Sequence, residues 1–174
     1  MNLNVSKGLD GVVAAATRLS DVQGDVGVLI YCGYNINELA GKFGSQCVVI
    51  GIDVQDGYVY KNTGDAKKMQ KTRWKAILWA REVERRGAGE IVLNTMQTDG
   101  TRVGYDLKTC SEVAETVRIP VIASGGAGTV EHFEEVFKKT RVSGALAASV
   151  FHTNTIKIPS LKKYLQKQGI LIRI

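Results

Sequence analysis

Cysteine, proline and histidine are scarce in this chain of 174 residues, which contains three, two and two of them. The cysteines (Cys32, Cys47 and Cys110) form no C-x-x-C pair and have no metal-type spacing, so a disulfide scaffold and a zinc site are both excluded and no metal is expected. No apolar run approaches the ~20 residues that span a bilayer, and the N-terminus lacks the apolar core of a secretory signal. These absences predict a cytoplasmic protein with no membrane partner.

The composition is that of a globular domain, with 44% hydrophobic and 23% charged residues. The formal net charge is +6, spread over small lysine and arginine clusters. No aromatic residues interleave with these clusters and no nucleic-acid motif is present, so we expect no nucleic-acid partner. A basic surface also suits an anionic, phosphorylated substrate.

Buried strands and amphipathic helices alternate along the chain from residue 46 onward. Continuous β-branched runs predict strands buried on both faces, and apolar spacings of three and four predict helices. The expected strands cover 26–34, 47–54, 90–96, 119–124 and 144–151, and the expected helices cover 35–43, 71–87, 107–117, 129–140 and 159–169. Asn35 is expected to cap the first helix, and a hairpin-like excursion is expected at 56–69.

Four strand–helix units in succession indicate parallel strands joined by helical crossovers. Two architectures fit this pattern: an open doubly wound sheet, or part of a (βα)8 barrel. A complete barrel requires about 250 residues and never many fewer than ~200. The chain is therefore too short to close an eight-stranded barrel by itself.

Candidate chemistry is sought where strands end, because functional groups of parallel sheets gather in the loops after the strands. Asp53 ends the first of the four units, where a carboxylate is placed for acid–base chemistry or caps a turn. Asn94 and Thr95 end the second, and Asp99 follows in a loop where it either contacts a ligand or forms a turn with Gly100.

The third and fourth units end in small residues, which leave room for a bound anion. Ser124, Gly125 and Gly126 follow one strand, and Ala148 and Ser149 follow the next. Backbone N–H groups in such loops, together with a helix N-terminus, can bind a phosphate. The alternative is a tight strand-to-helix turn, but small residues in two consecutive units favour a phosphate site.

Four long segments resemble the cyclase subunit of imidazole glycerol phosphate synthase: FGSQCVVIGID, ERRGAGEIVLNTMQTDGTRVGYD, IPVIASGGAGTVEHFEEVF and GALAASVFH. The resemblance covers about residues 41–174. It implies a (βα)4 half of a (βα)8 TIM barrel and a place in histidine biosynthesis. In that family, a lyase closes the imidazole ring with ammonia from a glutaminase partner, and no cofactor is needed.

The resemblance also assigns roles to single residues. It makes Asp53 the general acid, and it places Asn94, Thr95 and Asp99 near the substrate. Ser124, Gly125, Gly126, Ala148 and Ser149 would hold one of two phosphate groups. Glu90 matches one of four charged residues that gate ammonia entry. The family's first four units are absent, and with them the second catalytic carboxylate, so one chain is not expected to perform the full reaction.

Residues 8–40 resemble a different family, the N-terminal segment of citrate synthases. The shared pattern includes Gly8 to Val12, Leu29 to Tyr31, and Gly33-Tyr34 with Leu39. That segment is a small β-ribbon leading into a helix, and it carries no catalytic residue. We therefore expect an appended segment at 1–40 and the cyclase half-barrel at 41–174, with the ribbon covering a bare sheet edge that would invite aggregation.

The preferred hypothesis is a chimeric half-barrel that binds phosphate or a sugar phosphate with little or no turnover. A homodimer of two halves would complete an eight-stranded barrel, without the glutaminase. One alternative is an active cyclase whose missing half another chain supplies. The other is a purely structural, flavodoxin-like open sheet.

Overall fold

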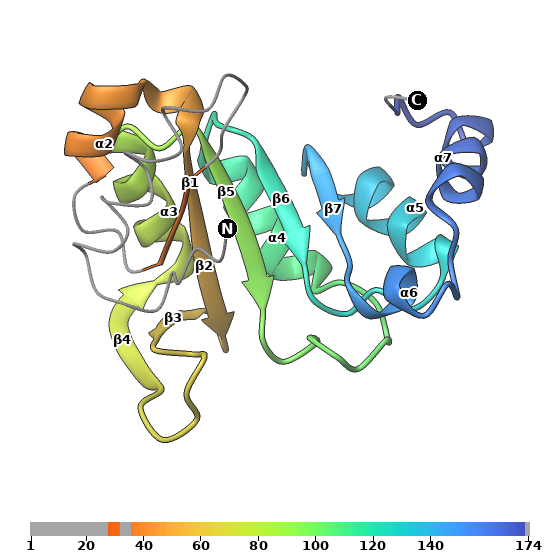
Figure 1. The fold of residues 1–174 in the computed structure, drawn as a ribbon, viewed down its shortest axis with the longest axis horizontal. Coiled ribbons are helices and arrows are strands. Elements are labelled where there is room, and N and C mark those ends of the chain that lie inside the picture. The colour runs from red at the N-terminus through yellow and green to blue at the C-terminus, as the bar shows by residue number, and fades with distance from the viewer. Residues whose placement is uncertain (1–27, 32–35, 173–174) are drawn as a thin grey trace.

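The computed structural model describes residues 28–31 and 36–172 of the chain (Figure 1). The described strands are β1 (Val28–Tyr31), β2 (Val48–Gln55), β3 (Tyr58–Lys61), β4 (Gln70–Lys75), β5 (Glu90–Thr95), β6 (Val121–Ser124) and β7 (Gly144–Leu146). The helices are α2 (Ile36–Phe43), the 3-10 turn η1 (Ser45–Cys47), α3 (Ala76–Arg85), α4 (Leu107–Thr116), α5 (Val130–Lys139), α6 (Ser149–His152) and α7 (Ile158–Lys167).

The strands form one sheet in the order β4-β3-β2-β5-β6-β7, and β1 pairs additionally with β2. Strands β1, β2, β5, β6 and β7 run parallel, whereas β3 and β4 form an antiparallel hairpin beside β2. The hairpin confirms the expected excursion after the first strand. The four strand–helix units are also confirmed, and the parallel sheet with its helices is consistent with part of a (βα)8 barrel.

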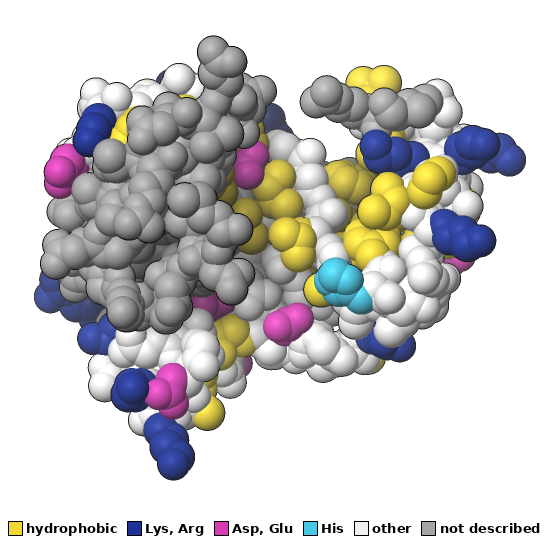
Figure 2. Space-filling model, in the orientation of Figure 1, with side chains coloured by type: hydrophobic (Ala, Val, Ile, Leu, Met, Phe, Trp, Pro, Cys, Tyr) yellow, Lys and Arg dark blue, Asp and Glu magenta, His cyan; other side chains and the backbone are white. Residues whose placement is uncertain are grey.

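Alternate side chains of the central strands decide which face of the sheet is covered. Ile50, Ile52, Ile91 and Leu93 are buried in the core together with α3, α4 and α5, which lie along one face (Figure 1). Val92, Ile122 and Leu146 lie on the other face and are partly or largely exposed. Figure 2 shows hydrophobic side chains gathered on that face. This open face corresponds to the interior of a barrel.

The outer edge of β2 is occupied along most of its length. β1 pairs with Val48–Gly51 and β3 pairs with Asp53–Gln55. Strand β1 comes from the segment expected to be a ribbon, and it runs parallel to β2 as a fifth strand of the parallel sheet. A second chain could not add to this edge of β2 without displacing β1, which bears on the expected eight-stranded dimer.

Two expected elements have different boundaries in the structure. The helix expected at 71–87 begins only at Ala76, because Gln70–Lys75 pairs with β3 as a strand. The strand expected at 144–151 ends at Leu146, and Ser149–His152 is a short helix. The predicted Asn35 cap lies outside the described residues. No helix in the described ranges is long and apolar enough to cross a membrane.

Candidate functional site

Cross-strand register brings the predicted polar residues into one row at the carboxyl end of the sheet. Asp53 pairs with Asn94, Asn94 with Ser124, and Ser124 with Leu146. Residues paired in register point to the same face, so Asp53, Asn94 and Ser124 border the open face where it ends. The parallel sheet thus brings these three candidate residues together at one end.

Asp53 is the buried acid of this row, with only 7% of its surface exposed. The Asn94 Nδ2 donates a hydrogen bond of 2.8 Å to the Oδ1 of Asp53. The Thr63 hydroxyl, in the hairpin between β3 and β4, donates to its Oδ2. Both carboxylate oxygens therefore have a donor, which offsets the cost of burial.

Thr95, also predicted near the substrate, lies on the opposite face of the sheet because neighbouring residues of a strand alternate. It is fully buried, and its hydroxyl donates to the carbonyl of Ser124 at 3.2 Å and pairs with the Thr98 hydroxyl at 2.7 Å. Its position suits a support for the loop rather than contact with a ligand at the open face.

The glycine loop after β6 is tightly packed against the long loop that follows β5. Gly125 and Gly126 have φ of 93° and 105°, a region that favours glycine. A Cβ on Gly126 would stand 2.0 Å from the carbonyl oxygen of Gly104, and one on Gly125 would stand 3.3 Å from the Asp99 Cβ. Close loop packing alone thus requires these glycines, as the alternative of a tight strand-to-helix turn predicts.

Ala148 and Ser149 are exposed where β7 gives way to α6. Among the described residues, no protein acceptor is found for the backbone N–H groups of Gly126 and Ala148. These two loops therefore present small side chains and unused donors at the same end of the sheet as Asp53. That combination can accommodate an anion.

Glu90 begins β5, opposite Val49 in the register, and so lies at the other end of the sheet from Asp53. This is the end at which the resemblance expects the ammonia gate. No group of three potential metal ligands occurs in the described part of the chain.

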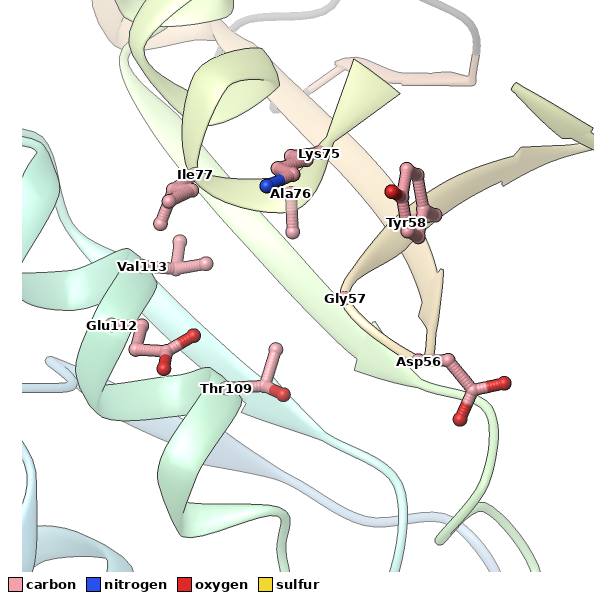
Figure 3. Close-up of a pocket in the computed structure, with 9 residues that line it drawn as sticks. All are labelled: Asp56, Gly57, Tyr58, Lys75, Ala76, Ile77, Thr109, Glu112 and Val113. Carbon is pink, nitrogen blue, oxygen red and sulfur yellow. The ribbon is translucent and has the colours of Figure 1, made fainter. Parts of the chain in front are cut away.

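A cavity of about 290 Å³ lies between the β2–β3 turn and helices α3 and α4 (Figure 3). It is bordered by the turn between β2 and β3, the start of α3 and one side of α4. Its lining includes the charged residues Asp56, Lys75 and Glu112 and the apolar residues Ile77 and Val113. None of the predicted site residues lines it.

Sequence reasoning missed several residues that shape the strand ends. Thr63 is one, because a threonine in an N-T-G turn gives no sign of reaching an acid ten positions earlier. Thr98 is another, since its hydroxyl donates to the Gly125 carbonyl at 3.2 Å. His132 caps α5, and its Nδ1 accepts hydrogen bonds from the N–H groups of Gly128 and Thr129.

Comparison with known proteins shows which family the chain belongs to. The family model described as "Histidine biosynthesis protein" matches residues 33–157. The chain is 52% identical over 145 residues to the imidazole glycerol phosphate synthase subunit HisF of Vibrio campbellii, 51% to that of Proteus mirabilis and 52% to that of Escherichia coli SE11. Each match covers 80% of this chain and 56% of the relative, so the chain spans about half the length of these curated relatives. The chain belongs to the histidine biosynthesis protein family.

Proposed function

We propose that this chain is a half-barrel of the histidine-biosynthesis cyclase that binds a phosphate group and turns over little or no substrate. The observation that carries the proposal is the pair of small-residue loops, at Gly125-Gly126 and Ala148-Ser149, beside the Asp53–Asn94 pair. The full reaction of the family needs two carboxylates on opposite sides of the barrel, and by resemblance this chain has only one of them, Asp53. Cytoplasmic location and the absence of a bound glutaminase are part of the same proposal.

Titration calorimetry of the full chain with inorganic phosphate tests the proposed binding. We expect saturable binding that Ser149→Asp abolishes, because a carboxylate at this exposed position would repel the anion. Ser160→Asp places the same charge on an exposed residue of α7 and should leave binding intact. Absence of binding, or equal loss in both variants, would contradict the proposal. Ser149 is preferable to Gly126 for this test because Gly126 is also required for loop packing.

We further propose that the chain forms a homodimer through β7 and the open face of the sheet. The two edges of the sheet path differ in character: β4 carries Lys71, Arg73 and Lys75, whereas β7 (Gly144–Leu146) has no charge. Charged edge strands resist pairing with another chain, and uncharged ones permit it. The same strand paired about a two-fold axis makes a self-complementary contact. In this arrangement the second copy adds at β7 and leaves β1 on β2.

Light scattering tests the dimer with a matched pair of leucines. Leu146 on β7 is 44% exposed and Leu78 on α3 is 50% exposed. We expect a dimer mass for the unmodified chain, a monomer for Leu146→Lys, and a dimer for Leu78→Lys. A monomeric unmodified chain would instead favour an open flavodoxin-like sheet whose role is only structural.

An active cyclase completed by another chain is the second candidate, and the retained Asp53–Asn94 hydrogen bond favours it. Cells that lack the cyclase would be supplied with this chain and a separate copy of the family's first half. Growth that Asp53→Asn abolishes would support activity, and no growth with wild-type Asp53 would support the non-catalytic proposal.

The assignment of residues 1–40 to an appended, citrate-synthase-like segment is likewise a proposal. Transplanting a family-derived strand in place of 1–40 would test whether this segment is needed for solubility.

A further inference from the structure

The proposed phosphate loops contain no cation of their own, and the nearest charged side chain of the predicted set is the carboxylate of Asp99. A dianion next to a carboxylate requires a compensating positive charge. We propose that Arg102, in the loop between β5 and α4, supplies that charge and binds the phosphate group directly. The inference rests on the proposed phosphate site and adds to it a residue that the sequence did not single out.

The backbone of Arg102 lies against the glycine loop. A Cβ placed on Gly128 would stand 2.2 Å from the Arg102 carbonyl oxygen and 2.9 Å from the Arg102 Cβ. Gly128 comes two residues before α5 begins at Val130. The arginine therefore starts beside the segment that connects the glycine loop to the helix N-terminus, where an anion is favoured.

The loop that carries Arg102 is fixed on both sides of it. The Gly104 N–H donates to the Gly126 carbonyl at 2.8 Å, and the Thr98 hydroxyl donates to the Gly125 carbonyl at 3.2 Å. Within the loop, the Thr101 hydroxyl donates to the Thr98 carbonyl at 2.6 Å. These contacts hold the Arg102 backbone in place relative to the glycines, so binding a ligand there requires no movement of the loop.

Arg102 combines an uncommon backbone conformation with a guanidinium that is free to bind a ligand. Its φ is 60°, in the left-handed region that non-glycine residues seldom adopt and that is often retained at ligand sites. Its side chain is exposed, and across residues 28–31 and 36–172 its guanidinium has no ion pair or hydrogen bond. A guanidinium without a protein partner is available for the bidentate contact that it makes with phosphate.

Calorimetric titration with inorganic phosphate at several salt concentrations distinguishes this role from a general effect of net charge. We expect Arg102→Gln to weaken binding about tenfold or more and to flatten its salt dependence, because a charge-assisted contact is lost. Arg102→Lys should lose less, since it keeps the charge and loses only the fork. Arg141→Gln removes the same charge from an exposed residue just before β7, at the other end of that strand, and should change affinity less than twofold.

Arg102→Asn provides a second variant in case the glutamine variant folds poorly, because asparagine tolerates the left-handed region. Circular dichroism establishes that each variant is folded before titration. If the unmodified chain binds phosphate and the Arg102 variants bind equally well, the role of Arg102 is refuted while the phosphate site stands. If the unmodified chain does not bind, both the site and the inference fail.

Discussion

Asp53 is held by side chains from two other elements of the fold. It is buried at the end of β2, and its two donors come from β5 and from the hairpin loop between β3 and β4. Neither donor is near Asp53 in sequence, so the acid has a fixed geometry only once the sheet and hairpin have formed. The position of a carboxylate at the strand end was predictable from sequence, whereas the partner Thr63 was not.

Replacement of Thr63 by valine tests how much the hairpin contributes to holding this acid. Valine keeps the volume but removes the hydroxyl that donates to Asp53. We expect the free energy of unfolding to fall by about 1–3 kcal/mol, because a buried carboxylate oxygen loses its partner. Urea unfolding measures the change. Thr155→Val, at an exposed position, should stay within about 0.5 kcal/mol of wild type, and equal effects at the two positions would argue against the Asp53 contact.

At the scale of elements, the contact between the β5–α4 loop and the glycine loop is among the tightest pieces of local packing. Gly126→Ala would place a methyl group at 2.0 Å from the Gly104 carbonyl while φ stays positive. We expect a loss of about 2 kcal/mol or more from strain and displacement of the loop. Gly64→Ala is the matched control, because nothing lies within 4 Å of its Cβ position. Thermal unfolding of both variants compares them, and a neutral Gly126→Ala would mean that the two loops are not packed so closely.

The elements that sequence reasoning placed correctly are those whose signals are local. β2 and β5 are continuous apolar runs, and α4 and α5 have caps and apolar faces that the sequence displays. The start of α3 was wrong because Lys71 to Lys75 fits a helical period equally well, and only pairing with β3 makes it a strand. The orientation of Thr95 was missed for a related reason. Alternation along β5 decides which face of the sheet its side chain points to, and a match of sequence motifs does not contain that information.

At the scale of the whole molecule, helices α3, α4 and α5 cover one side of the sheet, and no helix between residues 36 and 172 covers the side that carries Val92 and Ile122. Tyr105 links the long β5–α4 loop to the far strand, since its hydroxyl donates to the Leu146 carbonyl at 3.0 Å. Its ring also stacks edge-on against Phe133 of α5. Together with Cys110 on α4, Tyr105 places two titratable groups inside the core that joins the last two strands to the rest of the chain.

These two groups make the stability of the whole fold sensitive to alkaline pH. Burial, and then the nearby charge of Asp106, raise the pKa of the Cys110 thiol to about 12. Burial, and then Cys110, raise the pKa of the Tyr105 hydroxyl well above its usual range. In the unfolded chain these groups lose their protons near pH 8.5 and 10. Above those values the unfolded state binds fewer protons than the folded state, so the free energy of unfolding falls as pH rises toward 12.

Urea unfolding between pH 8 and pH 10.5 measures this loss. Between its unfolded-state and folded-state pKa values, each group should lower the free energy of unfolding by about 1.4 kcal/mol per pH unit. Cys110→Ala and Tyr105→Phe should each lower stability near neutral pH and make the decline with pH shallower. Tyr60→Phe, at a half-buried position of the hairpin strand β3, removes a phenol outside the core and should leave the slope unchanged. A slope that is unchanged in both Cys110→Ala and Tyr105→Phe would show that other groups govern the alkaline transition. A slope that is shallower in each single variant and disappears in the double variant would show that the two buried groups share it, and Cys110 does contribute to the raised pKa of Tyr105.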